Sequence, residues 1–408
     1  MSEPLPTDPY KGVRDFYPAD WARIELMFSR VREVLFAWGY EEYNASPMER
    51  AELYEAKTSE EIVNEQTYTF TDRGDRRVTL RPEMTPTLAR MVAGKRRELA
   101  FPLRWFSIGN RFRYERPQKG RLREFYQTDV DLVGLPEGEA DIEIVRLASE
   151  ILKSFGATEK DFIIRINSRA LLNSACKSAG LNAGETKSYL RLLDKKSKIT
   201  PEEFKIASKI ITNEDPLSFV KSESMEAFVA SLKKRGVENV IFDPSLTRGF
   251  DYYTGIVFEV FDTNIENPRA IFGGGRYDGL VELFGGESLP AIGFAFGDVT
   301  LADFLKTHGL AVDTNANKSQ LYIGTPNTDD IPSAQAFADV LRKNSARVFV
   351  NLSGRALGDQ IKDAVKRGIP YFVAYGADEI KNKTVRLKTL ATSEEKMLPV
   401  SELASAIL

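Results

Sequence analysis

The sequence predicts an α+β protein in which an antiparallel sheet with flanking helices is followed by a smaller α/β unit. Three observations support this expectation. Strand patterns come in pairs around turn residues within 66–85 and 104–131. A Lys-, Ser- and Ala-rich helical pattern at about 168–236 interrupts the strand-rich part, and we interpret it as a helical insertion. Beyond a polar linker at 312–318, strand and helix patterns alternate.

The first helices are predicted from apolar spacing and end signals. Over 20–38, apolar residues recur at three- and four-residue spacing, with Asp20 as the expected N-cap and Gly39 as the stop. After the hairpin, Thr85 is expected to cap a second helix, with Pro86 at its first position, where a missing N–H costs nothing.

The remaining elements are predicted from two spacings of apolar residues, which are every three or four positions in helices and alternate positions in strands. A strand pair is expected over 104–131, and a helix over 138–155 that stops at Gly156. Further strands of the large unit are expected at 239–242, 256–261, 270–272 and 291–296. In the C-terminal unit, the strand patterns LYIG, RVFVN, YFVAYG and TVRLKTL alternate with helices that begin at about Ile331 and Leu357.

Composition excludes several classes of protein. Hydrophobic residues make up 42% of the 408 residues and charged residues 28%, which is typical of a soluble globular protein. No apolar run approaches the ~20 residues of a membrane span, and the N-terminal MSEPLPTDPY lacks a signal peptide's apolar segment. We therefore expect a cytoplasmic protein with no membrane segment. The net charge of −3 argues against indiscriminate binding to nucleic acid, but it allows a local basic surface.

The chain has a single cysteine, Cys176, and a single histidine, His308. One of each cannot build a structural zinc site or a disulfide framework, so we expect no protein metal site. A histidine-based triad is also excluded unless His308 is its base. Catalysis is then expected to depend on Arg, Glu, Asp, Gln and Tyr, which favours electrostatic work on phosphates and carboxylates.

Two segments combine these residue types. LTRGFDYYTGIVFE (246–259) places an arginine, an acid and two tyrosines before an apolar strand pattern, and 104–131 is rich in arginines and carboxylates. Arg113 and Glu115 should share one face of a strand, where a guanidinium can bind phosphate and a carboxylate can accept an adenine amino hydrogen. The alternative is a surface hairpin with cross-strand ion pairs, and paired tyrosines alone would indicate cross-strand packing.

Together these segments resemble histidyl-tRNA synthetase, a class II aminoacyl-tRNA synthetase. The similarity runs from GVRDFYP near the N-terminus to GRALGDQIKDAVKRGIPYFVAYG in the C-terminal unit. It implies a class II catalytic domain over 1–311, with the helical insertion, and an anticodon-binding domain over 318–408. It also implies L-histidine, ATP with Mg²⁺ and histidine tRNA as ligands, and a homodimer whose interface is the N-terminal helix–strand pair.

The resemblance gives roles to individual residues. Those matching the family's histidine-binding positions are Glu83, Thr85, Arg113, Gln127, Asp131, Arg248, Tyr252 and Tyr253. Glu83 and Thr85 would hold the α-amino and carboxylate groups, and Asp131 the imidazole. The glycine-rich AIFGGGRYDGL (270–280), which contains Arg276 and Tyr277, is expected to be a turn that lines the site.

The same resemblance implies an ATP site on the second strand pair. Its residues are Arg113 and Arg121 for the phosphates, Glu115 for the adenine amino group and Phe125 for stacking on adenine. Arg248 and Arg113 would be the catalytic residues, because they would stabilise the charge that develops at the α-phosphate.

The chain departs from the family at Thr300, where most members carry an arginine that covers adenine and contacts the γ-phosphate. We therefore expect a raised Michaelis constant for ATP, with Arg121, Arg123 and Mg²⁺ supplying the missing charge. Two alternatives remain: a histidine-binding regulatory subunit of ATP phosphoribosyltransferase type, and an RNA-binding protein that uses only the C-terminal domain. Histidine-dependent exchange of pyrophosphate into ATP is expected of a synthetase and of neither alternative, so this assay separates the synthetase from both.

Overall fold

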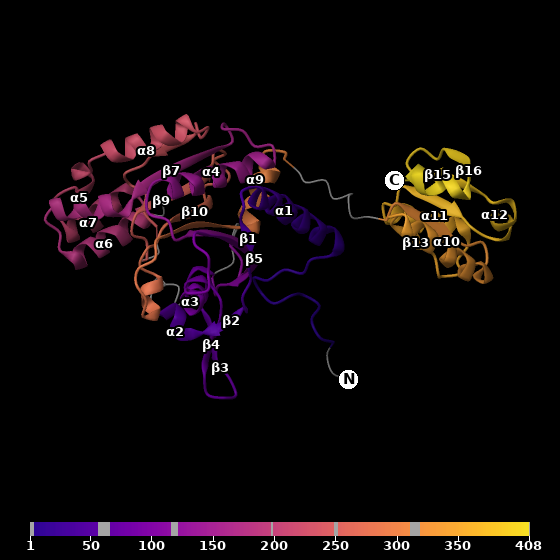
Figure 1. The fold of residues 1–408 in the computed structure, drawn as a ribbon, viewed down its shortest axis with the longest axis horizontal. Helices are drawn as coiled ribbons and strands as arrows, with labels where there is room; N and C mark the ends of the chain where they lie inside the picture. The colour runs from indigo at the N-terminus through magenta and orange to yellow at the C-terminus, as the bar shows by residue number, and fades with distance from the viewer. Residues whose placement is uncertain are drawn as a thin grey trace. The chain divides into compact units, whose positions relative to one another are not determined.

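The computed structural model describes residues 4–55, 66–115, 121–196, 199–248, 252–310 and 319–407. The chain divides into two compact units, Met1–Val312 and Asp313–Leu408. Each unit has its own sheet and its own hydrophobic core (Figure 1). In the described part of the chain, no helix is both long enough and apolar enough to span a bilayer.

The large unit is built on an eight-stranded sheet with the order β1-β5-β6-β11-β10-β9-β7-β8. Its strands are β1 (Glu41–Glu42), β5 (Leu103–Phe112), β6 (Glu124–Val133), β7 (Phe162–Ser168), β8 (Val240–Phe242), β9 (Ile256–Asp262), β10 (Ala270–Arg276) and β11 (Ala291–Gly297). All neighbours are antiparallel except β1 with β5 and β7 with β8, which are parallel. The predicted antiparallel sheet is thus confirmed for its centre, and the edges are mixed.

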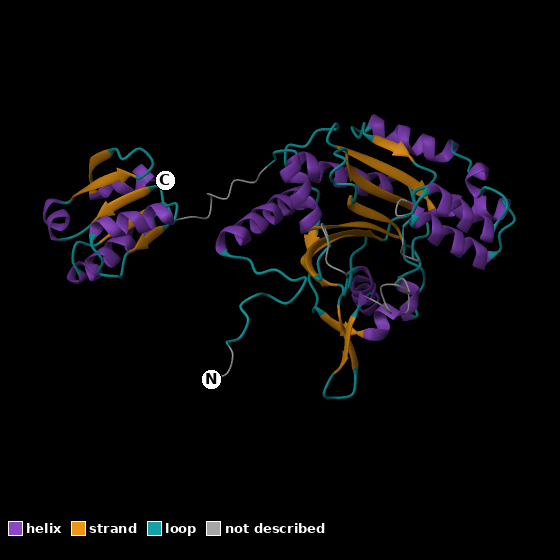
Figure 2. Cartoon of the chain, turned by 180° about the vertical axis from the view of Figure 1, so that it is seen from behind, coloured by secondary structure: helices purple, strands orange, loops and turns teal. Residues whose placement is uncertain are grey.

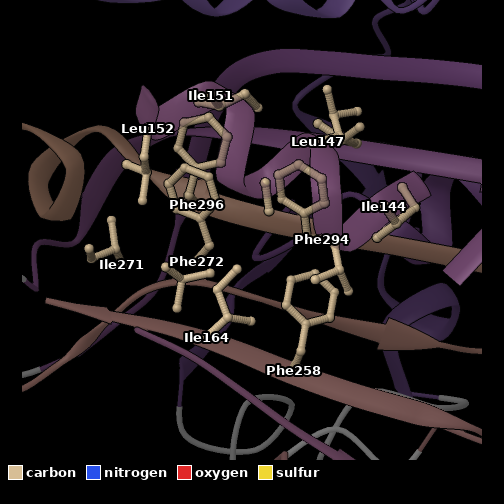
Figure 3. Close-up of a cluster of buried hydrophobic side chains, with 14 of the residues drawn as sticks. Ile144, Leu147, Ile151, Leu152, Ile164, Phe258, Ile271, Phe272, Phe294 and Phe296 are labelled. Atoms are coloured by element: carbon tan, nitrogen blue, oxygen red, sulfur yellow. The ribbon is translucent and has the colours of Figure 1, made fainter. Parts of the chain in front are cut away.

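Helices cover one face of this sheet (Figures 1 and 2). They are α1 (Pro18–Ala37), α4 (Glu139–Ser154), α8 (Glu223–Lys234) and α9 (Asp298–Thr307). Figure 3 shows aromatic rings of the strands against apolar side chains of α4; the labelled residues include Phe258, Phe272, Phe294, Phe296, Ile144, Leu147, Ile151 and Leu152. The rings of Phe272 and Phe296 stack with centroids 4.1 Å apart. Since fully burying one such side chain contributes about 1.5–3 kcal/mol, this layer anchors the sheet.

The ends of the first helices correct two predictions. Helix α1 begins at Pro18 after Tyr17, so Asp20 lies in the first turn instead of at the N-cap. Its end is as predicted, because Gly39 follows with a φ of 78°. Helix α3 (Thr85–Lys95) has Met84 as its N-cap and no side-chain cap, so the predicted capping role of Thr85 is wrong. Met84 already has αR dihedral angles, and the helix therefore starts one residue earlier than expected.

A second, three-stranded sheet lies beside α2 (Ala51–Glu55) and α3. Its strands are β2 (Met48–Arg50), β3 (Tyr68–Thr71) and β4 (Arg77–Leu80), in the order β2-β4-β3. The pairing of β3 with β4 around residues 72–76 confirms the predicted hairpin.

Between β7 and β8 the chain forms a group of helices. They are α5 (Arg169–Ser178), α6 (Ala183–Asp194), α7 (Pro201–Ile211), the 3₁₀ helix η3 (Pro216–Phe219) and α8. Ser168, Asn182 and Thr200 each cap a helix through a side-chain hydrogen bond. Cys176 is buried in the small core of this group, and it is a free thiol.

The C-terminal unit has a five-stranded sheet with the order β13-β12-β14-β15-β16. Its elements are β12 (Leu321–Gly324), α10 (Ile331–Lys343), β13 (Val348–Val350), α11 (Leu357–Lys366), β14 (Tyr371–Ala374), α12 (Ala377–Asn382), β15 (Thr384–Thr389), β16 (Glu395–Pro399) and α13 (Leu403–Ile407). The three parallel strands and their two connecting helices confirm the predicted alternation. The predicted strand β15 pairs antiparallel with β14, while α12, β16 and α13 were not predicted.

Candidate active site

Small residues lie on the face of the large sheet that is opposite the helices, and the site is expected on this face. Side chains alternate between the two faces of a strand, so the neighbours of core-facing residues point away from the helical layer. The small residues on this open face are Gly109 of β5, Gly273 and Gly275 of β10, and Gly293, Ala295 and Gly297 of β11. They leave space directly above the sheet for polar side chains from other segments.

The glycine-rich segment forms strand β10 and not the turn that the sequence predicted. Gly273 pairs with Glu259 of β9. A Cβ added at Gly273 would overlap the guanidinium of Arg248, and one at Gly275 would lie 2.9 Å from the ring of Tyr253. Glycine is therefore required at both positions because side chains of the site lie flat against the backbone.

Arg248 is held over β10 by an ion pair with Glu259. Burial disfavours its charge, but the interactions with Tyr253 and Glu259 outweigh this effect and raise the pKa of the guanidinium. Its Nε atom is buried and has no hydrogen-bond partner. A charged guanidinium that keeps a donor available is suited to an anionic ligand. The next three positions of the quoted motif, 249–251, lie outside the described residues.

The predicted amino-acid contacts meet beside Arg248. The hydroxyl of Tyr252 donates to Glu83 Oε2 at 3.0 Å, and Tyr252 also hydrogen-bonds the side chain of Thr85. Tyr253 packs on Tyr252 with ring centroids 4.9 Å apart. Burial, followed by the charge of Glu83, raises the pKa of Tyr252 well above its usual value, so its phenol stays protonated. Glu83, Thr85, Tyr252 and Tyr253 thus form one cluster, although 169 positions separate Glu83 from Tyr252.

Asp131 is a buried residue of β6 on the site face of the sheet. The hydroxyl of Tyr277 donates to its Oδ1, while its Oδ2 is buried without a hydrogen-bond partner. Burial, and then the neighbouring charge of Asp129, raise the pKa of Asp131 to about 8, against the opposing effects of Tyr277 and Arg111. Gly293 makes this packing possible, because a Cβ there would overlap the carboxylate. A buried acceptor without a donor fits a ligand that brings an N–H.

Gln127 lies on the same face of β6 as Asp131, because the two residues are four positions apart on one strand. Its amide nitrogen donates to Asp129 Oδ1 at 2.7 Å, and Arg111 holds the other oxygen of Asp129 at 2.5 Å. Arg111 and Asp129 are almost fully buried, so removing either one would leave an unpaired buried charge. This ion pair therefore positions Gln127.

The predicted ATP residues lie at the open end of β5 and β6. Strand β5 ends at Phe112, so Arg113 and Glu115 lie in the segment after it, and their predicted shared strand face is wrong. The chain turns away here because the Glu115 N–H bonds back to the Arg113 carbonyl at 2.7 Å. Arg113 lies 5.4 Å from the ring centroid of Phe125 and donates to the Pro82 carbonyl at 2.9 Å.

A second arginine of the predicted ATP site lies just before β6. Arg121 forms an ion pair with Glu115 at 2.8 Å. Burial lowers the pKa of Arg113, and the charges of Glu83 and Glu115 oppose that effect. The two predicted phosphate contacts, Arg113 and Arg121, are thus brought together, and residues 116–120, where the sequence predicts a turn, lie outside the described residues.

Arg123 and Thr300 both have hydrogen-bond partners within the protein. Arg123 lies 4.0 Å over the ring of Tyr114, and it donates to the Tyr10 hydroxyl at 3.0 Å and to the Glu115 carbonyl at 3.2 Å. The Thr300 hydroxyl donates to the carbonyl of Gly297 at 3.1 Å. Arg121 and Arg123 thus each have partners of their own, and the replacement of the missing arginine by Arg121, Arg123 or Mg²⁺ stays a prediction.

The adjacent residues Arg276 and Tyr277 point in opposite directions. Arg276 faces the helical layer and forms a bidentate ion pair with Asp141 at the start of α4, at 2.9 and 3.0 Å. Tyr277 faces the site and bonds Asp131. The alternation of a strand explains this division. Arg276 fastens β10 to α4, and only Tyr277 belongs to the site.

The single histidine is part of the scaffold. His308, at the C-terminus of α9, lies 2.8 Å from Asp262 and 3.2 Å from Asp161. Within the ranges that the structure describes, no group of three or more His, Cys, Asp or Glu residues is arranged to hold a metal ion.

Comparison with known proteins identifies the family. The profile of histidyl-tRNA synthetase matches residues 12–204 and 200–300, and that of an anticodon-binding domain matches 317–408. A histidine–tRNA ligase of Leptospira biflexa is 41% identical over 423 aligned positions, which cover 98% of this chain and 96% of the relative. The chain belongs to the histidyl-tRNA synthetase family. A histidine–tRNA ligase of Opitutus terrae is 36% identical, with 97% of both chains covered.

Solved structures of the family have the same fold. The histidyl-tRNA synthetase of S. aureus superposes with a TM-score of 0.75 at 25% identity, covering 99% of this chain and 100% of that one. The enzyme from Nostoc sp. PCC 7120 gives a TM-score of 0.77 at 24% identity, with 98% and 99% covered. The class II core, helical insertion and C-terminal anticodon-binding domain that the sequence predicted are therefore confirmed as the fold.

Sequence reasoning missed three residues that support the site. Glu259 pairs with Arg248, and Arg111 with Asp129 positions Gln127. A usable signal was present. It applies to Asp129, which lies two positions from both Gln127 and Asp131 on one strand pattern and therefore shares their face.

Proposed function

We propose that this aminoacyl-tRNA ligase, a histidine–tRNA ligase, joins L-histidine to the AMP part of ATP and then transfers the histidyl group to histidine tRNA. In the first step, a carboxylate oxygen of histidine attacks the α-phosphorus. The bond from that phosphorus to the bridging oxygen of the β-phosphate breaks, and pyrophosphate leaves. In the second step, a hydroxyl of the tRNA's terminal adenosine attacks the carbonyl carbon, and AMP leaves.

The observation that carries this proposal is the buried, unpartnered Oδ2 of Asp131 near the Glu83–Tyr252 pair. One end of the pocket then offers an acceptor for an imidazole N–H, and the other a carboxylate for an α-ammonium group. Gln127 would contact the same ammonium group, and Thr85 the carboxylate region. An amino acid with a ring N–H satisfies both ends together.

The charge that develops at phosphorus would be stabilised by Arg248 and Arg113. Arg248 can contact phosphate through its unused Nε while it keeps its ion pair with Glu259. Tyr253 packs beside it and limits its movement. Preorganised donors of this kind act at the developing charge without reorganising during the reaction.

ATP would bind with its adenine on Phe125 and its phosphates toward the arginines. Glu115 would accept the adenine amino hydrogen and Arg121 would contact the β- and γ-phosphates, after exchanging their mutual ion pair for these contacts. Mg²⁺, held mainly by the phosphates, would neutralise part of their charge.

The proposal extends to the rest of the chain. Residues 1–311, with the insertion at about 168–236, would carry out both chemical steps, and residues 318–408 would contact the anticodon. We also propose a cytoplasmic homodimer with α1 and β1 at its interface. A histidine-sensing regulatory role is less well supported, because full-length relatives at 36–41% identity are histidine–tRNA ligases.

Two assays test the function. The first is histidine-dependent exchange of labelled pyrophosphate into ATP, and the second is charging of histidine tRNA by the full chain. We expect both activities, with exchange absent when histidine is omitted or replaced by another amino acid. Histidine binding without exchange at saturating Mg·ATP would reject the ligase assignment.

A further inference from the structure

The ATP site lacks a cation at the start of α9, where Thr300 stands. Its hydroxyl bonds the carbonyl of Gly297 and lies 3.4 Å from the carbonyl of Ile271, so α9 begins directly against the first residues of β10. Phe125 lies close by, because a Cβ at Gly297 would be 3.8 Å from its Cδ2 atom and 3.7 Å from the Thr300 hydroxyl. The first residues of β10 therefore border the proposed adenine position.

Arg269 immediately precedes β10, two residues before Ile271. The side chain is half-buried, and its Nη1 atom is enclosed without a hydrogen-bond partner. Its charged neighbours are Arg121 and Glu115, the two residues assigned to the phosphates and the adenine amino group. Burial first, and then the charge of Arg121, lower the pKa of Arg269, whereas Glu115 opposes them.

Two fully buried arginines of this unit have carboxylate partners, whereas the buried Arg81 donates to the carbonyls of Asn110 and Ala45. Arg111 pairs with Asp129, and Arg276 with Asp141. Arg269 has no ion pair within 4.0 Å in the ranges that the structure describes, since Glu115 is already bound by Arg121. Enclosing a guanidinium nitrogen without a partner opposes folding. In Arg111, whose Nε is also enclosed, the ion pair with Asp129 offsets this cost, and among the described residues Arg269 has no such pair.

We propose that Arg269 is an ATP-binding residue that supplies, from the start of β10, the positive charge that most of the family places at the Thr300 position. This inference rests on the proposed function and deepens it. A guanidinium beside Phe125, Glu115 and Arg121 can cover adenine and reach the terminal phosphates of ATP. The positive charge would then lie at the start of β10 instead of at the start of α9.

The experiment compares Arg269→Ala with the wild type in pyrophosphate exchange. We expect the Michaelis constant for ATP to rise about two- to thirtyfold, the range of a cation–π contact, while that for histidine changes less than twofold. Arg235→Ala removes an exposed arginine that is paired with Glu139, so it is the matched control and should leave both constants unchanged. Arg269→Gln removes the charge but keeps the first three carbons and a polar end, and it replaces the alanine variant if that one fails to fold.

A rescue variant separates replacement of the cation from a general loss of structure. Thr300→Arg introduced into Arg269→Ala should restore the Michaelis constant for ATP to within about threefold of wild type, because one cation is again present beside Phe125. An unchanged ATP constant in Arg269→Ala and Arg269→Gln, an equal rise for ATP and histidine, or no rescue by Thr300→Arg would each overturn the proposal.

The two proposals fail in different ways. A wild-type protein without histidine-dependent exchange contradicts the ligase function. The role of Arg269 is then measured by calorimetry with Mg·ATP alone, where equal affinity of wild type and Arg269→Ala overturns it. Weaker binding of Mg·ATP to Arg269→Ala than to Arg235→Ala supports it.

Discussion

Tyr277 donates its phenol hydrogen to one oxygen of Asp131 and leaves the other oxygen buried without a partner. The two residues are 146 positions apart, and the contact is possible because Gly293 has no side chain between them. Tyr277 thereby fixes the direction in which the free oxygen points. In the proposed reaction, that oxygen selects histidine by its ring N–H.

Asp131→Asn should weaken histidine binding and leave ATP binding nearly unchanged. A hydrogen bond to a charged group contributes about 1.5–3 kcal/mol, so above about pH 8, where Asp131 is ionised, we expect the Michaelis constant for histidine to rise by roughly ten- to a hundredfold. Calorimetry with each substrate checks this. A loss of ATP affinity with histidine affinity preserved would contradict the assignment.

The pH dependence of histidine binding should follow the same carboxyl. Burial raises the pKa of Asp131 to about 8, and the ionised form is the stronger acceptor. Histidine affinity should therefore increase as pH rises through about 8, and Asp131→Asn should remove this increase. Titration calorimetry between about pH 6.5 and 9 measures it, since the histidine imidazole is mostly neutral above ~6.5.

The stability of the ligand-free protein should decrease as pH rises, whereas histidine affinity increases. The folded-state pKa of Asp131 is raised above its unfolded value of ~3.9. This group's contribution to stability is therefore fully present below about pH 4 and is lost as pH rises through about 8. Thermal melting of wild type against Asp131→Asn over that window isolates the contribution, and a constant difference between the two would contradict it.

Arg248→Ala should abolish adenylate formation while the protein stays folded. Removing a donor aimed at developing charge typically costs ~10²–10³ in rate. Single-turnover formation of histidyl-adenylate measures the loss, and circular dichroism checks the fold. A variant with near-normal pyrophosphate exchange would show that Arg248 does not contact the reacting phosphate.

Gly273→Ala should impair catalysis, although Gly273 has no proposed contact with a substrate. The new Cβ would overlap the guanidinium of Arg248, so that side chain must move away from β10. Overpacking of this kind costs about 1–3 kcal/mol of stability. We expect a lower kcat and a lower Tm. Gly94→Ala is the matched control, because its Cβ would meet nothing within 4 Å in helix α3, and it should be neutral or stabilising.

Removing residues 318–408 should leave pyrophosphate exchange largely intact and strongly reduce tRNA charging. The large unit, Met1–Val312, has its own sheet and core, so it should fold without the C-terminal unit. Both activities are compared at equal concentrations of truncated and full-length protein. A folded truncation that charges tRNA normally would contradict an anticodon-binding role for 318–408.

The sequence alone determined the elements whose signals are local. The hairpin of β3 and β4, helix α4 between Gly138 and Gly156, and the alternation of β12 to β14 with α10 and α11 were predicted within a few residues. Caps, turn residues and apolar periodicity act over a few positions, so they can be recognised without knowing the fold. Family resemblance added the candidate site residues, which local patterns could not rank.

Only the tertiary structure decided which of those residues meet and on which side of the sheet. It moved Arg113 and Glu115 off the strand, turned Arg276 toward α4 and Tyr277 toward Asp131, and brought Arg269 beside Glu115. These outcomes depend on strand register and on glycines that let distant segments touch. Register is set by packing the buried face of the whole sheet, so no single segment of the sequence contains that information.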